Sequence, residues 1–169
     1  MAKTSRVERL KSGIIVVRDC IVNYDQTPAE AVKGLPHNND LIASSYPLAC
    51  WNGGKSGIVE GATIPLFFPG RVFTTAEGRE GLAAQSIGYG VPADLTPLKD
   101  EEVRQDLAEM GIWWVGAFDK DDESLWLGSN RRRRVVYLYL NPHCLGFNLS
   151  YPDLDWNDLD AVAGSPQVS

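Results

Sequence analysis

The second half of the chain alternates short apolar segments with turn-forming residues, and this alternation limits the fold more than any other feature. The apolar segments are rich in β-branched and aromatic residues, which favour strands, and each is followed by Asp, Asn, Gly, Ser or Pro. Strands joined by such short turns pair in antiparallel fashion. We therefore predict a C-terminal β-meander. Its strands are residues 112–118, 124–128, 131–140, 145–151 and 159–163.

About three short helices are predicted from their N-terminal signals. Thr27 is a typical N-cap and Pro28 suits the first helical position, so the first helix is expected over residues 27–34. A capping box of Thr74 and Glu77 opens the second helix, over residues 75–86. A Thr-Pro pair opens the third, over residues 97–110.

Two further strands are predicted in the first half, over residues 13–24 and 58–68. Because Pro65 lacks a backbone donor, the second of them is expected at an edge or a bulge. The first is apolar on both pleat faces, since side chains alternate along a strand. One face is expected to carry Ile14, Val16, Cys20 and Val22, and the other Ile15, Val17 and Ile21. The stretch 37–57 is rich in turn formers and is predicted to be irregular.

The order of these elements predicts the fold class. A strand and a helix come first, helices follow, and the meander comes last, which indicates an α+β protein with a mainly antiparallel sheet. A chain of 169 residues that is 44% apolar can bury one core. We therefore expect a single α+β domain over residues 1–163 and a flexible C-terminal tail over residues 164–169.

Charge and hydropathy bear on partners and location. The net charge is −6, and an acidic chain is poorly suited to neutralise phosphates, so nucleic-acid binding is not expected. The basic N-terminal segment is followed by only five uncharged residues, 13–17, too few for a signal peptide or a membrane span. We expect a cytoplasmic protein, or one carried in a phage particle, without membrane contact.

Catalytic chemistry has few candidate residues. The three cysteines have no pattern of a disulfide framework or a zinc site, which favours a reducing compartment. A thiol nucleophile needs a nearby base, and Cys50 beside Trp51 resembles a buried core residue more than a nucleophile. A hydrolase that uses acidic residues or Cys50 is therefore an alternative hypothesis. The other residues considered for it are Cys144, His37, His143, Glu101–Glu102 and Asp121–Glu123.

Several segments together resemble a family of small bacterial and phage-borne proteins that is functionally uncharacterised. They are VNYDQTPAEAV, NNDLIASSYP, TTAEGREGL, GYGVPADLTPL, GIWWVGAF and FNLSYPDLDWNDLDAVA. The resemblance extends over residues 16–163 and implies no activity. The chain departs from the family pattern at Asp94, where the family has Thr, and it lacks an arginine of the closing strand. The layout is more distantly similar to C-type-lectin-like domains.

The lectin similarity implies a possible calcium site. Trp156-Asn157-Asp158 matches the calcium motif of carbohydrate-binding C-type lectins, and calcium takes six to eight oxygen ligands. The second motif and the disulfides of those lectins are missing. We expect no cofactor, with calcium as the alternative. The candidate ligands are Asp153, Asp155, Asn157 and Asp158, with Asp160 nearby.

The aromatic residues of the meander suggest a binding surface. Trp113 and Trp114 are adjacent, so on a strand they face opposite sides of the sheet, while Tyr137 and Tyr139 share one side. Trp, Tyr and Arg contribute most of the energy at protein interfaces. We predict a non-catalytic binding or assembly protein that contacts a protein partner or itself, as a homo-oligomer, through this aromatic surface.

Four consecutive arginines enter the same strand. Alternation places Arg131 and Arg133 on the face of Tyr137, where they join the predicted partner surface, and Arg132 and Arg134 on the opposite face. We predict that the run pairs with the acidic residues 119–123 across the hairpin, rather than with nucleic acid.

Overall fold

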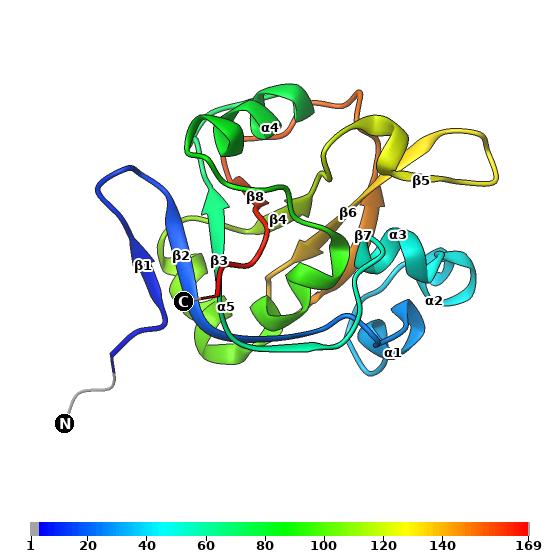
Figure 1. The fold of residues 1–169 in the computed structure, drawn as a ribbon, viewed down its shortest axis with the longest axis horizontal. Helices are drawn as coiled ribbons and strands as arrows, with labels where there is room; N and C mark the ends of the chain where they lie inside the picture. The colour runs from blue at the N-terminus through cyan, green and yellow to red at the C-terminus, as the bar shows by residue number, and fades with distance from the viewer. Residues whose placement is uncertain (1–3, 169) are drawn as a thin grey trace.

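The computed structural model describes residues 4–168 and contains an eight-stranded sheet with helices on both faces (Figure 1). All strand pairs are antiparallel except β4 with β8. The prediction of a single α+β domain with a mainly antiparallel sheet is confirmed. Residues 1–3 and 169, the ends of the predicted domain and tail, lie outside the described residues. The spatial order is β1 (Val7–Arg9), β2 (Ile15–Asn23), β3 (Ile58–Phe67), β8 (Asp160–Ala163), β4 (Trp114–Ala117), β6 (Arg133–Tyr139) and β5 (Trp126–Leu127), and β7 (Gly146–Ser150) also pairs with β6.

The position of β8 differs from the prediction. We expected residues 159–163 to close the meander, but β8 lies inside the sheet, antiparallel to β3 and parallel to β4. All four of its residues are buried, which suits an interior strand. This insertion pairs Asp160 directly with Trp114.

The segment after β8 is also better held than a flexible tail. Gly164 donates its N–H to the Pro65 carbonyl at 2.8 Å, and Gln167 exchanges two backbone hydrogen bonds with Thr63, each 2.8 Å long. Residues 164–167 therefore continue the packing along β3, and the boundary at residue 163 was placed too early.

Pro65 lies in the interior of the sheet, so its predicted place at an edge or bulge is wrong. It pairs with Val16 of β2 on one side. Its carbonyl points the other way, to Gly164, just beyond the end of β8. The N–H that proline lacks would point in that same direction, so Gly164 donates to Pro65 without a reciprocal bond, just beyond the end of β8.

A bulge in β2 changes which residues share a face. The pairing with β3 shifts between Val17 and Cys20, and Asp19 adopts a left-handed conformation with φ of 55°. Cys20 consequently packs in the same core as Val17, not with Ile14 as strict alternation predicted, and Ile21 is exposed.

Two of the predicted helices form where their caps indicate. Thr27 caps α1 (Pro28–Val32), and the Thr74 capping box opens α4 (Thr75–Ala84). The third begins later than predicted, because α5 spans Glu101–Glu109 and the Thr-Pro pair lies inside a preceding 3-10 helix, η1 (Pro92–Lys99). Asp94 of η1 is fully buried and accepts hydrogen bonds from the Tyr24 hydroxyl at 2.7 Å and the Val91 N–H at 2.8 Å.

The stretch predicted to be irregular contains two short helices, α2 (Asp40–Ser45) and α3 (Leu48–Asn52). Asn39 caps α2 through its side chain, and Gly53 ends α3 in the left-handed conformation. Trp51 of α3 is fully buried and makes an edge contact with Phe147. This tertiary contact stabilises helices too short to persist alone.

Two cores lie on opposite faces of the sheet. The larger core packs α1, α2, α3, η1 and α5 against strand residues such as Val115 and Leu138. The smaller core packs Leu82 of α4 against Val162 of β8. In Figure 1, α1, α2 and α3 gather at one end of the sheet, and α4 lies apart from them at the top.

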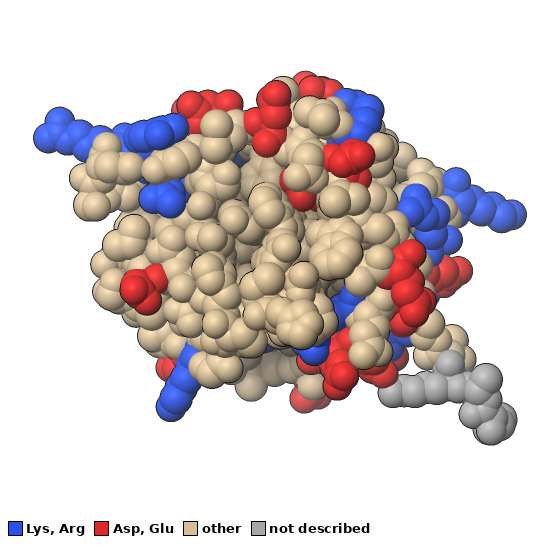
Figure 2. All heavy atoms as spheres, turned by 180° about the vertical axis from the view of Figure 1, so that it is seen from behind, with Lys and Arg blue, Asp and Glu red and all other residues tan. Residues whose placement is uncertain are grey.

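Charged side chains are unevenly distributed over the surface (Figure 2). On the face shown in Figure 2, uncharged residues fill the centre, and Lys, Arg, Asp and Glu gather mainly around the edge. Within residues 4–168, the helices are too short or too polar for any of them to cross a bilayer.

Candidate functional site

Neighbouring strands bring a set of aromatic and polar side chains onto one face of the sheet. Trp114 of β4 pairs with Asp160 of β8 on one side and with Tyr139 of β6 on the other. Tyr137 pairs with Asn148 of β7. Directly paired residues point to the same face, and this is the face of the smaller core. We call Trp114, Tyr137 and Tyr139 the aromatic platform.

The three rings of the aromatic platform contact one another. Trp114 stacks on Tyr137, with ring centroids 4.8 Å apart and planes inclined by 21°. Tyr139 meets Trp114 edge-on, at 5.6 Å and 68°. All three side chains are half-buried, so part of each ring remains accessible. Stacked and edge-on pairs of this kind stabilise a fixed ring arrangement.

Two cavities flank the aromatic platform, and Trp114 and Tyr139 line both. The β7-side cavity has a volume of about 230 Å³, and the β8-side cavity about 380 Å³. Trp114 is the tryptophan that joins the two tyrosines, because its ring contacts both of theirs. Trp113 lines the β8-side cavity. The β7-side cavity is lined by His37, Trp114, Tyr137, Tyr139, Cys144 and Asn148. The β8-side cavity is lined by Trp113, Trp114, Tyr139, Asn141, Asn157, Leu159 and Asp160.

Asp160 is the charged residue of this site. Its side chain is 2% exposed, and one carboxylate oxygen, Oδ2, accepts the Asn157 N–H at 2.8 Å. The other oxygen, Oδ1, is buried without a hydrogen-bond partner among residues 4–168. The pKa of Asp160 is raised to about 6, mainly by burial and also by the nearby charge of Asp158, while the hydrogen bond from the Asn157 N–H opposes this rise. The sequence predicted Asp160 in the last strand, next to the acidic loop, but did not predict the pairing of β8 with β4 that brings Asp160 to Trp114.

His37 and Cys144 both line the β7-side cavity, on the side of the aromatic platform away from Asp160. The His37 ring lies with Nε2 3.4 Å from Asn148 Nδ2, and Cys144 lines the same cavity. The segment of residues 37–39 runs along β7, because His37 and Asn39 donate their N–H groups to the carbonyls of Leu145 and Phe147. Sequence reasoning considered this histidine and cysteine for catalysis but did not connect them with the aromatic residues.

The arginine run does not join the aromatic platform. Arg131 lies in the turn before β6 in a left-handed conformation, with φ of 62°, and Arg133 donates to the Leu125 carbonyl at 2.9 Å. Neither residue lines the two cavities. The predicted pairing with residues 119–123 is wrong, because in the described chain the partner of Asp122 is Arg79, at 2.8 Å.

The other two arginines pack on a tyrosine beyond β7. Arg132 lies 3.5 Å and Arg134 4.5 Å from the centroid of the Tyr151 ring. Arg132 also pairs with Asp153 at 3.3 Å. The alternation of the run between two faces was predicted from the sequence, but the long-range partners depend on how β7 pairs with β6.

Two of the four candidate calcium ligands already bind other groups of the protein, and the other two are exposed side chains. Asp153 pairs with Arg132, and the Asn157 side-chain oxygen accepts the Leu159 N–H at 2.9 Å. Asp155 and Asp158 are exposed. Among residues 4–168, no group of three or more His, Cys, Asp or Glu side chains is placed to hold a metal ion. Trp156 of the same motif is buried, and its indole N–H donates to the Thr75 hydroxyl at 3.0 Å.

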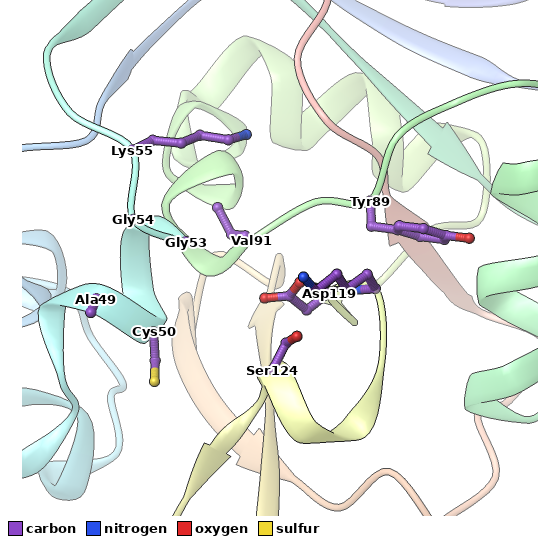
Figure 3. Close-up of a pocket in the computed structure, with 10 residues that line it drawn as sticks. Ala49, Cys50, Gly53, Gly54, Lys55, Tyr89, Val91, Asp119 and Ser124 are labelled. Carbon is purple, nitrogen blue, oxygen red and sulfur yellow. Dashed lines mark hydrogen bonds between the residues drawn. The ribbon is translucent and has the colours of Figure 1, made fainter.

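A larger cavity, of about 530 Å³, contains Cys50 and is separate from the aromatic platform (Figure 3). In this view Asp119 lies above Ser124 near the middle, Cys50 lies to their left, and Lys55 lies at the upper left. Burial raises the pKa of the Cys50 thiol, and the charge of Asp119 raises it further. The thiol is therefore held in its protonated form, which is a poor nucleophile.

Asp119 itself adopts a conformation that is unusual for a residue other than glycine, with φ of 54°. Burial raises the pKa of its carboxyl group. The cavity is lined by Ala49, Cys50, Gly53, Gly54, Lys55, Tyr89, Val91, Asp119, Lys120 and Ser124. An acidic residue and Cys50, the two elements of the hydrolase hypothesis, thus lie in one cavity.

Comparisons of the chain with protein-family models, with curated proteins and with solved structures find no match. A fold does not by itself imply a function, so the function is argued from the geometry of these sites.

Proposed function

We propose that the protein is a non-catalytic binding or assembly protein and that the aromatic platform is its interface with a protein partner. The observation that carries this proposal is the fixed, half-exposed arrangement of Trp114, Tyr137 and Tyr139 on the sheet. Tryptophan and tyrosine supply large contact areas at little cost in conformational entropy, which is why they dominate the energy of protein interfaces.

The surroundings of the aromatic platform support the same proposal. The two cavities beside it are preformed hollows into which side chains of a partner fit. The platform strands β4 and β6 also belong to the hydrogen-bonded interior of the sheet. A rigid surface of this kind loses little freedom on binding.

The first test selects binding peptides. A displayed library of linear peptides is selected on the wild-type protein, and affinities are measured by calorimetry. We expect the selected peptides to lose about tenfold or more in affinity on Trp114→Ala, because a central aromatic residue carries much of the interface energy. Tyr89→Ala is the matched control, since Tyr89 is a half-buried aromatic residue of the Cys50 cavity. Peptides that bind all three proteins equally would contradict the proposal.

A second copy of the chain is one possible partner, and light scattering distinguishes this case. A dimer or larger assembly of the wild type that becomes monomeric in Tyr137→Glu would identify self-association through the aromatic platform. A monomeric wild type that still binds the selected peptides would identify a different protein as the partner. Circular dichroism confirms that the variant is folded.

A second candidate function is hydrolysis in the cavity of Cys50 and Asp119. The observation that favours it is the left-handed backbone of Asp119, since strained residues cluster at functional sites. A carboxyl group with a raised pKa suits a general acid.

In that case, the wild type should hydrolyse members of a panel of chromogenic esters and glycosides. Asp119→Asn should lower the rate about 100-fold, because an amide cannot transfer the proton. The exposed residue Glu80, which does not line this cavity, provides the control Glu80→Gln, which should keep the wild-type rate. A wild type that turns over none of the panel would remove this candidate.

A further inference from the structure

We propose that the aromatic platform binds a quaternary ammonium group in the β8-side cavity, against Trp114 and Tyr139 and within the field of the Asp160 carboxylate. This inference rests on the proposed binding function and adds to it the chemical class of the bound group.

The Trp114 and Tyr139 rings form two inclined walls of a site where a cation can bind. Trp114 and Tyr139 line the same cavity with their planes inclined by 68°. Tyr137 stacks on the Trp114 indole, and the indole stays half-exposed and lines the β8-side cavity. The faces of aromatic rings carry negative electrostatic potential, and a cation within about 6 Å of a ring centroid is attracted to them.

The charge at the site is negative and has no counter-ion among the cavity-lining residues. Asp160 is buried, with one oxygen bonded to the Asn157 N–H and the other without a partner in the described chain. The neighbouring charge is that of Asp158, and Tyr137 on β6, two strands away in the sheet, is a titratable group whose pKa the Asp160 charge raises. Neither Lys nor Arg is found among the residues that line this cavity. A buried carboxylate without a counter-ion is costly, and a bound cation would offset that cost.

The hydrogen-bond acceptors explain why the cation should be quaternary. Asp160 Oδ1 is shielded from solvent, so the carboxylate charge would attract a bound cation through space and not by a direct hydrogen bond from Oδ1. The side-chain oxygens of Asn141 and Asn157, which line the cavity, already accept backbone N–H groups of His143 and Leu159. A lysine ammonium or a guanidinium would therefore lose water without gaining enough acceptors. A quaternary ammonium group has no N–H to satisfy and needs only the rings and the charge.

The ionisation of Asp160 gives the site a pH dependence. The pKa of Asp160 is about 6 in the free protein, so the carboxylate is ionised at neutral pH and mostly protonated near pH 5. A bound cation favours the ionised form. Affinity should therefore be full above the pKa and should fall as the pH drops through it.

The test compares choline with 3,3-dimethylbutan-1-ol, which has the same shape but carries a carbon in place of the charged nitrogen. Binding to the wild type is measured by calorimetry and by ligand-observed NMR. We expect choline to bind about tenfold more tightly than the neutral alcohol. Trp114→Ala should abolish binding of both compounds. Asp160→Asn should remove the preference for choline and its pH dependence, while the exposed Asp155→Asn should leave both unchanged.

A peptide arm identifies the source of the group. A short peptide with trimethyllysine is compared with the same peptide carrying unmodified lysine. Tighter binding of the trimethylated peptide than of choline would assign the group to a protein partner, and equal binding would assign it to a small molecule. Both outcomes support recognition of quaternary ammonium.

Two outcomes would overturn the inference. One is equal binding of choline and the neutral alcohol, and the other is the absence of choline binding by the wild type. In either case the proposed binding function is judged separately, by the peptides selected on the wild type and weakened by Trp114→Ala.

Discussion

Gly146→Ala is expected to lower the free energy of unfolding by about 3 kcal/mol or more, the upper range for steric overpacking. A Cβ atom on Gly146 would lie 1.2 Å from the carbonyl oxygen of His37 and 2.3 Å from its carbonyl carbon. These are backbone atoms, so no side-chain rotation relieves the clash. The segment of residues 37–39 is tied to β7 by hydrogen bonds from His37 and Asn39, at 3.0 and 3.1 Å. Relief of the clash must break them.

Urea denaturation followed by circular dichroism measures this effect. Gly128→Ala is the control, because a Cβ at Gly128 would have its nearest contact at 3.4 Å, an ordinary van der Waals distance. That variant should be close to neutral. Equal stability of Gly146→Ala and wild type would show that residues 37–39 do not lie against β7, and would also remove His37 from the β7-side cavity.

Asp160→Asn is expected to change stability in a pH-dependent manner. The folded pKa of Asp160 is about 6, above the value of an exposed aspartate, so the native state binds more protons than the unfolded state between about pH 4 and pH 6. Stability from Asp160 is therefore complete below that window and is lost as the pH rises through it. The wild type should lose about 2 kcal/mol relative to the variant between about pH 4 and pH 7.5.

The measurement is a pair of urea titrations for each protein, one at each pH. The variant keeps an oxygen to accept the Asn157 N–H, so this bond need not be lost. Asp155→Asn is the matched control, since it removes one acidic charge from the same loop at an exposed position and Asp155 does not shift the pKa of Asp160. A difference between wild type and Asp160→Asn that stays constant with pH would contradict the raised pKa. It would also remove the pH dependence near pH 6 that is expected of the ammonium site.

Local signals were sufficient for those parts of the fold that depend on neighbouring residues. The caps at Thr27 and Thr74 placed α1 and α4, because a side chain that binds an N–H three residues later acts without distant partners. The glycines Gly78 and Gly81, unfavourable in an isolated helix, have a tertiary explanation. A Cβ on either would lie 2.6 Å or less from the ring of Phe118 or Phe67.

Distant contacts account for the errors. The helices α2 and α3 depend on the burial of residues such as Trp51, which local composition does not report. The insertion of β8 between β3 and β4 is a pairing across the whole sequence, and nothing near residue 160 signals it. The late start of α5 reflects the preference of Thr-Pro for the preceding 3-10 helix.

The same distinction applies to the candidate site. Alternation along one strand was enough to place Tyr137 and Tyr139 on the same face, and adjacency required that only one of Trp113 and Trp114 join them. Which tryptophan it is, and the arrival of Asp160 beside it, depend on the register between strands. Register is set by the packed core and cannot be read from one strand alone.

The position of β8 also has a consequence for the order of folding. In the sheet, β1, β2 and β3 form one hydrogen-bonded group, β4, β6, β5 and β7 form another, and β8 joins them. β8 follows all other strands in the sequence. During synthesis the two groups emerge from the ribosome with facing edges unpaired, exposed to chaperones and to other chains. The two groups join through β8 by contacts between residues far apart in the sequence, so we expect this to be the slow step of folding. Asp160 and Trp114 become adjacent only at that step.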